Sequence, residues 1–503
     1  MKNQISIYLI FLSTLSLFSC VKEINDNNSN HNNTNKIELT SDEITSICYD
    51  EPKTLSEQEV FSIISEFQET LQSQGANTKS SSTSQYKIKN KYFLPIKSSI
   101  QTRSGETVNQ QIPIFEVIAE SNGQKDFIVI SADERVPKIL YYGFDIKSED
   151  LPIEIRYIIE LAKNSIKQDI CRIDSLQECL RSSTISKLSQ KINMDEKKFS
   201  FEDIKEHIIS IDNMKTKGNP IGGYDKPTQI MSFVNPMTKT EWDQTEPYNN
   251  EMPIVDIFDV AAEDGTEYSV KGHAPLGCAT VCIAQLLACV KAPFTGVTLD
   301  GKSVPIDWKC VTQSEYIFMN EDFPGNPDYN SPADQILMIT GLMRQVFLGL
   351  KSTFVLSPQG FVKETSTTDA NMLSYLSTVV NYQGGESRMF DASYAKNSLT
   401  NLKPVLLYGQ GTVSDDFGNV RTAGHAWLLD GYFLCRKAGQ TSPTQQDFYW
   451  SVNIGWGYCN SKGYFLASGQ YLSDCDVVMP NGWTGTCTFL TQDQHMLYNI
   501  TKK

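Results

Sequence analysis

A cysteine and a histidine, far apart in the chain, are the residues whose types and settings point to chemistry. Cys278 follows Gly277 and opens a stretch, Ala279 to Val290, in which nearly every residue is apolar or small. This composition predicts a helix that is covered on all sides. Cys278 would lie in its first turn, where unpaired N–H groups and the positive end of the helix dipole favour a thiolate. Core packing is the competing interpretation, and we prefer it for Cys282 and Cys289 in the same helix.

A cysteine nucleophile needs a base that can also protonate the leaving group, and a histidine does both near neutral pH. His425 is the best candidate, because it follows Gly424 at the predicted start of a strand, where a substrate backbone can approach. A histidine that only packs in a strand is the alternative for His425 taken alone. The other histidines lie in a polar tether, in a charged helix, near the C-terminal end, or too close to Cys278 to face it easily: His31, His207, His495 and His273.

Length and charge set limits on the class of protein. The chain has 503 residues, and this length predicts about two to four domains. Its net charge of -15 argues against nucleic acid or an anionic membrane surface as the main partner. The sequence has no Cys-x-x-Cys pair and no cluster of histidines, so we expect no zinc site and no cofactor.

The N-terminus has the order of a secretory signal. Met1-Lys2 is followed by an apolar run from Ile5 to Phe18 that is too short for a typical spanning helix. Leu17-Phe18-Ser19-Cys20 resembles a bacterial lipobox, which implies that Cys20 is lipidated and becomes the mature N-terminus. We therefore expect an exported lipoprotein of the cell envelope, with residues 1–20 as its signal peptide. The alternative is an ordinary signal cleaved nearby, with Cys20 incidental.

The first half of the chain predicts a tether and then a small α+β domain. Residues 21–37 are rich in asparagine and have little to bury, which is typical of a disordered tether. The apolar spacing of Leu55 to Leu71 fits an amphipathic helix, and Pro152 to Ile170 predicts a helix that starts near a proline. Apolar runs predict strands at Ile112 to Ile118, Asp126 to Ser131 and Val136 to Tyr142.

The second half predicts the larger core. Met214 to Lys226 contains lysines and glycines and predicts an exposed linker. All the tryptophans come after it, so we expect the large packed core there. A buried helix followed by strands favours the α+β class with an antiparallel sheet. The predicted strands are Pro404 to Tyr408, His425 to Leu429, Asp447 to Val452 and Gly463 to Leu466.

Three groups of residues in this half form an ordered set. They are Gly277-Cys278-Ala279-Thr280 with Ala284-Gln285, then Gly424-His425-Ala426 with Asp430-Gly431, then Val452 to Gly457 with Gly463-Tyr464-Phe465. The set resembles the motifs of the streptopain family of papain-like cysteine proteases, peptidase family C10. Trp242-Asp243-Gln244 resembles the family segment that supplies an oxyanion-hole glutamine, and Phe127 to Tyr142 resembles the signature of its inhibitory propeptide.

The resemblance implies an α+β fold in which a papain-like catalytic domain, residues 217–503, follows a small α+β propeptide domain and linker, residues 38–216. It implies a cysteine endopeptidase made as a zymogen. Cys278 would be a thiolate paired with the imidazolium of His425, and the oxyanion of the acyl-transfer step would meet the backbone N–H of Cys278 and the amide of Gln244.

We expect the residues around these groups to line the substrate cleft, with core packing as the alternative for the tryptophan: Gly424, Gly455, Trp456 and Gly457. The expected partners are protein or peptide substrates, the chain's own propeptide and, through Cys20, a membrane lipid. Cleavage near Lys215 or Lys217 would release the catalytic domain from its anchor unless the propeptide stays bound.

One position departs from the family pattern. Where the family has Asn-Trp-Gly-Trp-Gly, this chain has Ile454 in place of the first tryptophan, after Asn453. The group that orients His425 is therefore open. Asn453 can orient the imidazole, as a papain-type asparagine does, or it can point into the core or cap a turn.

Other functions and pairings remain open on the sequence alone. An inhibitory surface lipoprotein that uses the propeptide-like domain as a binding module, and a non-catalytic adhesin, are alternatives that would not need Cys278, His425 and Gln244. An acyltransferase or amidase on the same fold would share the acyl-enzyme. In an exported chain, disulfides can join Cys171 with Cys179 or Cys475 with Cys487.

Overall fold

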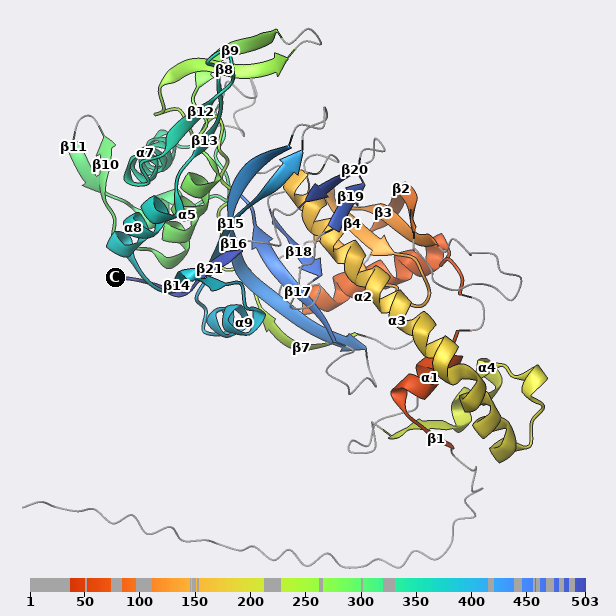
Figure 1. Cartoon of the computed structure of the whole chain (residues 1–503). Coiled ribbons are helices and arrows are strands. Elements are labelled where there is room, and N and C mark those ends of the chain that lie inside the picture. The colour runs from red at the N-terminus through yellow and green to blue at the C-terminus, as the bar shows by residue number, and fades with distance from the viewer. Residues whose placement is uncertain are drawn as a thin grey trace, which may run out of the picture.

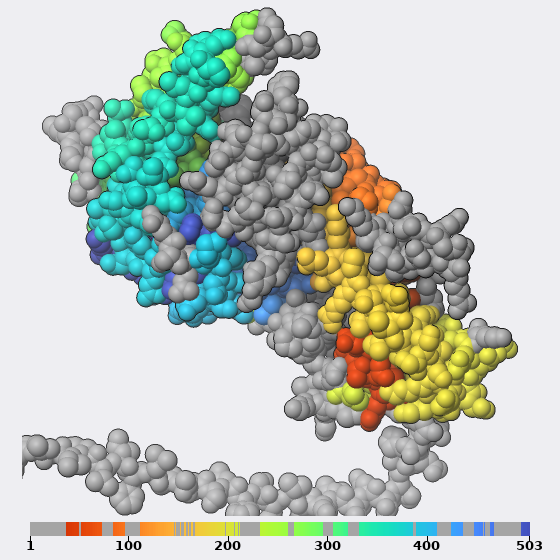
Figure 2. All heavy atoms as spheres, viewed as in Figure 1, coloured from red at the N-terminus to blue at the C-terminus, as the bar shows by residue number. Residues whose placement is uncertain are grey.

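The computed structural model shows an α+β protein, as the sequence predicts (Figure 1). The described residues are 37–49, 52–73, 84–95, 111–144, 146, 151, 153–211, 228–261, 266–299, 302–319, 331–414, 420–437, 446–455, 457, 462–466, 475–478, 484–487 and 494–503. In the space-filling view, the N-terminal segments coloured red to yellow and the segments coloured green to teal occupy opposite ends of the molecule (Figure 2).

The N-terminal half is an antiparallel sheet with a helix packed on it. Its strands pair in sequence order: β2 (Gln85–Pro95), β3 (Gln111–Ser121), β4 (Gln124–Ser131) and β5 (Ile139–Gly143). Helix α2 (Glu57–Ser73) adds Val60, Ile64 and Leu71, all fully buried, to the core of this sheet. Burial of such side chains stabilises the domain by about 1.5–3 kcal/mol each.

The long helix α3 (Ile153–Ile192) runs from this sheet to a small outer unit (Figure 1). Arg135, which is buried, holds the helix to the sheet, because its guanidinium lies 2.7 Å from Asp133 and 2.8 Å from Asp174 of α3. The outer unit has its own core, to which Leu188 of α3 contributes. It comprises β1 (Ile37–Leu39), α1 (Ser41–Ile47), η1 (Glu196–Lys198), α4 (Phe201–Ile204), η2 (Lys205–His207) and β6 (Ile208–Ser210).

The C-terminal half places helices against a twisted sheet. The helices are α5 (Cys278–Val290), α6 (Trp308–Val311), α7 (Ala333–Gly349), α8 (Asp369–Val379) and α9 (Ala392–Thr400). The strands of the main sheet are β7 (Thr228–Val234), β14 (Val380–Met389), β15 (Val405–Ser414), β16 (Val420–Lys437), β17 (Gln446–Asn453), β18 (Lys462–Leu466) and β21 (His495–Lys502).

Smaller sheets surround this body. A four-stranded sheet stands at one end in the order β12-β13-β8-β9 (Figure 1). Its strands are β8 (Ile254–Ala261), β9 (Glu267–His273), β12 (Thr353–Leu356) and β13 (Val362–Ser366). Two hairpins complete the described strands: β10 (Thr295–Leu299) with β11 (Lys302–Pro305), and β19 (Cys475–Val478) with β20 (Thr484–Cys487).

The two halves share one sheet. Strand β18 of the C-terminal half pairs antiparallel with β5 of the N-terminal half, with Phe465 opposite Tyr141, so an 11-stranded sheet crosses the boundary between them. One hydrophobic core spans the same boundary, and Phe67 of α2 packs its ring 5.4 Å from those of Phe433 and Tyr449. The N-terminal half is therefore an integral layer of the fold.

Tyr141 fits this junction because two glycines leave room for its ring. A Cβ at Gly463 of β18 would lie 2.5 Å from a ring carbon of Tyr141, and one at Gly143 would overlap its hydroxyl. Across the same boundary, the ammonium of Lys138 lies 3.1 Å from Asp169 of α3 and 3.1 Å from Asp447 of β17. The junction is thus held by shape, by main-chain pairing and by charge.

The structure confirms the predicted strands and the helices after Leu55 and at Cys278, with two corrections. Helix α3 continues to Ile192, well beyond the predicted end at Ile170, because Leu188 still has a core to pack against. His425 lies inside β16 and not at its start, because β16 begins at Val420. Cys171 and Cys179 are both free cysteines on α3, so they form no disulfide with each other. Cys475 and Cys487 lie opposite each other in the backbone pairing of β19 with β20.

Several predictions fall on positions outside the described residues. They are the signal peptide with Cys20, most of the tether 21–37, and the linker at the 216/217 domain boundary. These stay predictions. Within the described part of the chain, no helix combines the length and apolar character needed to cross a bilayer.

Candidate active site

Cys278 is the first residue of α5, and the residue before it has to be glycine. Gly277 has a φ of +82°, a conformation that L side chains rarely adopt. A Cβ on Gly277 would lie 2.8 Å from the backbone oxygen of Thr365, so β13 passes directly beside this turn. This close approach fixes the start of α5 and therefore the position of Cys278. The first N–H groups of a helix have no partner within the helix, so Cys278 lies among free N–H donors.

The rest of α5 is core, as the composition predicts. Every residue from Thr280 to Ala288 is buried. Burial raises the pKa of the Cys282 thiol well above its ordinary value, because a thiolate loses its solvation there. Cys282 is therefore a packing residue, whereas Cys278 at the same helix is only partly buried.

The thiol of Cys278 meets the strand that carries His425. Its Sγ lies 3.9 Å from the carbonyl oxygen of Gly424, the residue before His425. His425 is 8% exposed, and its ring stacks on that of Trp427 at 5.9 Å between centroids and 20° between planes. Alternation along β16 places both rings on one face of the strand. The sequence-predicted pair thus lies on adjacent elements, α5 and β16.

The burial of His425 favours the neutral imidazole. Burial lowers its pKa to about 4, and a hydrogen bond to the backbone of Ile454 acts in the opposite direction. A hydrogen bond that raises the pKa of a histidine is one in which the ring N–H donates to an acceptor. The backbone acceptor of Ile454 is its carbonyl oxygen, so this carbonyl accepts the hydrogen bond from the His425 ring. The resemblance implies an imidazolium here, whereas the burial of the ring opposes that charged form.

Asn453 makes its hydrogen bonds away from His425. Its side chain is 1% exposed, and its amide nitrogen donates to the Thr240 carbonyl at 2.9 Å and to Gln285 Oε1 at 3.2 Å. Its oxygen accepts from Gln285 Nε2 at 3.2 Å and from the Gly455 N–H at 3.1 Å. Of the three interpretations left open by the sequence, these contacts favour a side chain that points into the core and also caps the turn at Gly455. Asn453 thus holds the end of β17, and the carbonyl of the next residue, Ile454, contacts His425.

Gln285 is the residue of this network that sequence reasoning missed as a site element. It is fully buried on α5, and its oxygen accepts from the hydroxyl of Thr240 and from the N–H of Trp242, both at 3.1 Å. Gln285 therefore joins α5, β17 and the segment that carries Gln244. A glutamine within an otherwise apolar buried helix was the available signal, because a buried amide needs partners from outside the helix.

The backbone of Gln244 is bound to the segment just before Cys278. Its carbonyl accepts from the N–H of Leu276, two residues before Cys278, at 3.0 Å. Its own N–H donates to the carboxylate of Asp243 at 2.5 Å. Among the described residues, the Gln244 side-chain amide has no protein hydrogen-bond partner.

Two glycines bring the Asn453 strand end close to these residues. A Cβ on Gly455 would lie 3.2 Å from Val281, and one on Gly457 would lie 2.8 Å from the Asp243 carboxylate. Both have positive φ values, +76° and +65°. Gly424, the fourth predicted cleft position, is exposed, and Trp456 lies outside the described residues.

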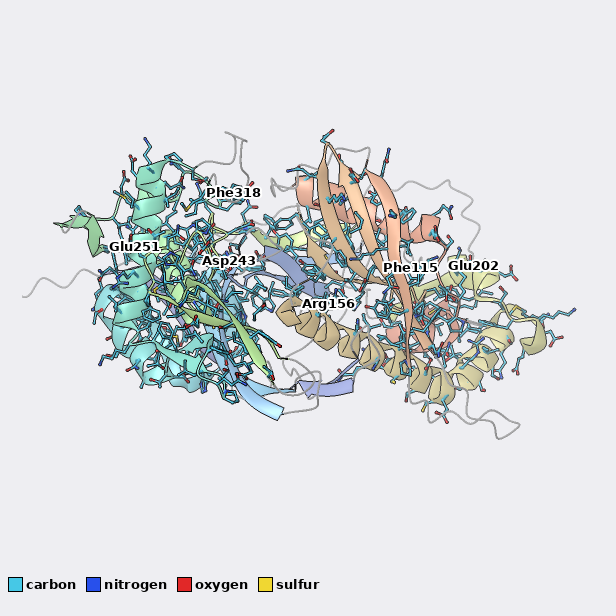
Figure 3. All side chains as sticks on the ribbon, turned by 90° about the horizontal axis from the view of Figure 1, so that it is seen from above. Phe115, Arg156, Glu202, Asp243, Glu251 and Phe318 are labelled. Atoms are coloured by element: carbon cyan, nitrogen blue, oxygen red, sulfur yellow. The ribbon has the colours of Figure 1, made fainter. Side chains whose placement is uncertain are left out.

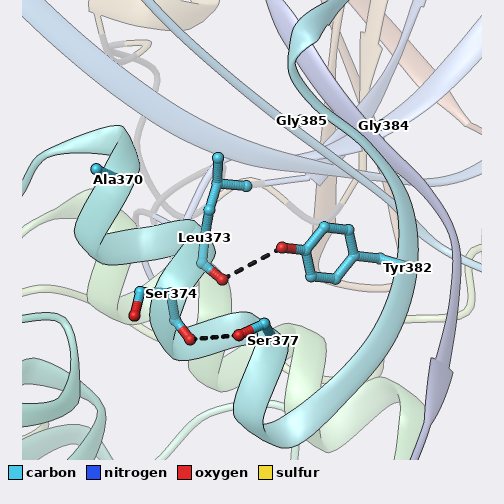
Figure 4. A pocket seen from close by; sticks show the side chains of 7 residues that line it. All are labelled: Ala370, Leu373, Ser374, Ser377, Tyr382, Gly384 and Gly385. Atoms are coloured by element: carbon cyan, nitrogen blue, oxygen red, sulfur yellow. Dashed lines mark hydrogen bonds between the residues drawn. The ribbon is translucent and has the colours of Figure 1, made fainter.

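The part of the chain that the structure describes contains no cluster of potential metal ligands. A cavity of about 580 Å³ lies between α8 and β14 (Figure 4). It is lined by Ala370, Leu373, Ser374, Ser377, Tyr382, Gly384 and Gly385, so it offers hydroxyls and small side chains but no acid, base or nucleophile of the predicted kind.

Comparison with known proteins identifies the family. Residues 242–465 match the model of the Peptidase C10 family. This segment belongs to the peptidase C10 family. The C10 segment begins at Trp242 and contains Gln244, Cys278, His425 and Asn453.

Other comparisons are more distant. Among solved structures, the active wild-type interpain A cysteine protease of Prevotella intermedia matches with 17% identity and a TM-score of 0.31, covering 54% of this chain and 96% of that chain. No curated protein matches the chain. Membership of the C10 family therefore rests on the segment 242–465, and it supports the activity of a cysteine peptidase.

Proposed function

We propose that this protein is a cysteine endopeptidase in which Cys278 is the nucleophile and His425 the general base and acid. The observation that carries the proposal is the position of the Cys278 thiol, at the N-terminus of α5 and 3.9 Å from the carbonyl of the residue before His425, inside the C10 segment. Thiolates are favoured at helix N-termini, and a neighbouring histidine completes the activation of the thiol.

The reaction follows from these groups. His425 takes the thiol proton, and the sulfur attacks the carbonyl carbon of a peptide bond. The negative charge on the carbonyl oxygen meets the backbone N–H of Cys278 and the side-chain amide of Gln244. His425 then protonates the leaving amine, and water, with His425 as base, releases the acyl group from the sulfur.

We further propose that residues 38–216 are a propeptide and that the described form is latent. The lowered pKa of His425 supports this, because the burial that lowers it to about 4 opposes the thiolate–imidazolium pair. The pairing of β5 with β18 and the shared core support a propeptide that is bound as part of the fold. Activation would then require cleavage in the predicted linker followed by separation or movement of the N-terminal half.

The lipobox-like Leu17 to Cys20 motif supports an exported, lipid-anchored precursor. Release into the medium after cleavage is the expected fate of the catalytic half if the N-terminal half dissociates. Labelling with a radioactive fatty acid, lost in a Cys20→Ser variant, would test the anchor. Incorporation that is unchanged in the variant would exclude lipidation at this cysteine.

The central test compares the wild-type chain with Cys278→Ala under reducing conditions. We expect the wild type to mature, to degrade casein and to be labelled by a thiol-directed epoxide, and we expect the variant to do none of these. Cys171→Ser, at an exposed cysteine on α3, is the matched control and should behave as wild type. If the wild type and Cys278→Ala are processed identically and neither acts on casein, the N-terminal domain as an inhibitory binding module becomes the better interpretation.

A further inference from the structure

Asp243, between Trp242 and Gln244, carries a partly buried carboxylate. Figure 3 labels it among the packed side chains of the C-terminal half. It forms no ion pair with any lysine or arginine of the described residues. Its partners are instead donors of its own turn, since Gln244 donates its backbone N–H at 2.5 Å and the backbone and side chain of Thr245 donate as well.

The strand end after Asn453 closes over this carboxylate. The N–H of Gly457 donates to the carbonyl of Trp242 at 3.1 Å. Any side chain at Gly457 would collide with Asp243, because a Cβ there would lie 2.8 Å from its Oδ2. The carboxylate therefore sits between its own turn and the backbone of the segment that follows Ile454, the residue in contact with His425.

Gln244 is consequently fixed on both sides of its backbone. Its N–H is bound by Asp243, and its carbonyl is bound by the N–H of Leu276, two residues before Cys278. The side-chain amide of Gln244 has no protein partner of its own among the described residues, so its position depends on these backbone contacts. Without Asp243, the backbone of Gln244 itself keeps, among the described residues, the Leu276 contact alone.

We propose that Asp243 is a positioning residue that holds the Gln244 amide at the oxyanion hole. The inference rests on the proposed function, in which Gln244 donates to the oxyanion. A donor must lie within about 2.7–3.1 Å of the developing oxyanion, and a displacement of about 1 Å can cost about 100-fold in rate. The carboxylate of Asp243 would fix the distance between the Gln244 amide and the oxyanion by holding the Gln244 backbone, without itself contacting the substrate.

The test uses the matured enzyme and four variants: Asp243→Ala, Asp243→Asn, Gln244→Ala and the double variant Asp243→Ala/Gln244→Ala. We expect Asp243→Ala to lower kcat by about 10- to 100-fold with KM changed by less than about 3-fold. Asp243→Asn should restore most of kcat, because its side-chain oxygen can accept the same N–H. Alkylation of Cys278 by iodoacetamide, which forms no oxyanion, should proceed at the wild-type rate in all of them.

The double variant separates positioning from a general structural role. If Asp243 acts through Gln244, its loss adds little to Gln244→Ala, so the two effects are strongly non-additive. Fully multiplicative effects, or an Asp243→Ala variant with wild-type kcat, would overturn the inference. Asp391→Ala is the control, because Asp391 accepts the N–H of Ser393 at 2.8 Å as the N-cap of α9, a helix that carries none of the site residues, and it should leave kcat unchanged.

Failure of the two proposals can be told apart. If the wild type itself does not hydrolyse casein, the proposed function fails and the Asp243 variants carry no information on catalysis. If Asp243→Ala does not fold, Asp243→Glu takes its place, because the longer side chain keeps the charge and displaces the acceptor. A Glu variant with wild-type kcat and KM would then count against positioning by Asp243.

Discussion

Truncation of Asn453 to alanine distinguishes an asparagine that orients His425 from one that holds the core. The side chain makes four hydrogen bonds, to Thr240, Gly455 and twice to Gln285, and it is 1% exposed. Its removal takes the partner from three buried polar groups, and each such loss costs about 1–3 kcal/mol. We therefore expect the free energy of unfolding to fall by about 3–5 kcal/mol, at the large end for a single substitution.

The catalytic effect should be smaller than that of losing a group that orients the base. In a serine protease triad, replacing the orienting residue lowers kcat by about 10⁴-fold. Here the carbonyl of Ile454 contacts the imidazole, so an Asn453→Ala molecule that remains folded keeps this contact. We expect kcat per folded molecule, measured at low temperature, to fall by about 10-fold or less.

Urea denaturation in a Cys278→Ala background measures the stability without self-cleavage, and an active-site titrant counts the folded enzyme in the kinetic assay. Gln285→Ala is the matched variant, because it removes the other half of the reciprocal amide pair. The double variant should cost much less than the sum of the two single changes. An Asn453→Ala enzyme with wild-type stability and a 10⁴-fold lower kcat would refute this reasoning and return the orienting role to Asn453.

Three further outcomes follow from the structure. Gly463→Ala should loosen the docking of the N-terminal half, seen as faster proteolysis of residues 38–211, because the added methyl meets the ring of Tyr141. The free energy of unfolding of the full-length chain should fall by about 3 kcal/mol as the pH falls from 6.5 to 4, because His425 binds a proton in the unfolded chain but not in the folded one, where its pKa is about 4. Urea titrations of His425→Asn should show a weaker dependence of stability on pH. After oxidative refolding, non-reducing peptide mapping should show Cys475 joined to Cys487, because directly opposite residues of an antiparallel pair lie within disulfide range, whereas free thiols at both positions would contradict this.

Local patterns in the sequence predicted the elements that carry the site. The helix at Cys278 was predictable because its nine consecutive buried positions carry no charge and are apolar or small except for Gln285. The strand of His425 was predictable because its residues alternate between two cores. The end of α3 was not, because the residues after Ile170 are mostly polar and the helix is held there by the small outer unit. That unit is assembled from segments at both ends of the N-terminal half, which no local window can show.

The orientation of His425 shows a different limit of sequence reasoning. Ile454 was expected to leave a gap in the orienting group, because a tryptophan is replaced there. In the structure the backbone carbonyl of Ile454 contacts the imidazole of His425. Every residue type has such a carbonyl, so the residue types alone cannot predict this contact. Conversely, Asn453 carries the residue type expected of an orienting group but is used by the Thr240–Gln285 network.

The shared sheet has a consequence for activation if residues 38–216 act as a propeptide. Cleavage in the predicted linker breaks one covalent connection, but it leaves the pairing of β5 with β18, the Lys138 contacts and the common core intact. Separation would expose the unpaired edge of β18 and the buried aromatic side chains around Phe433, which costs apolar burial on both halves. Cleavage alone therefore leaves a docked complex, and further digestion of the N-terminal half, or a rearrangement around β18, has to precede full activity.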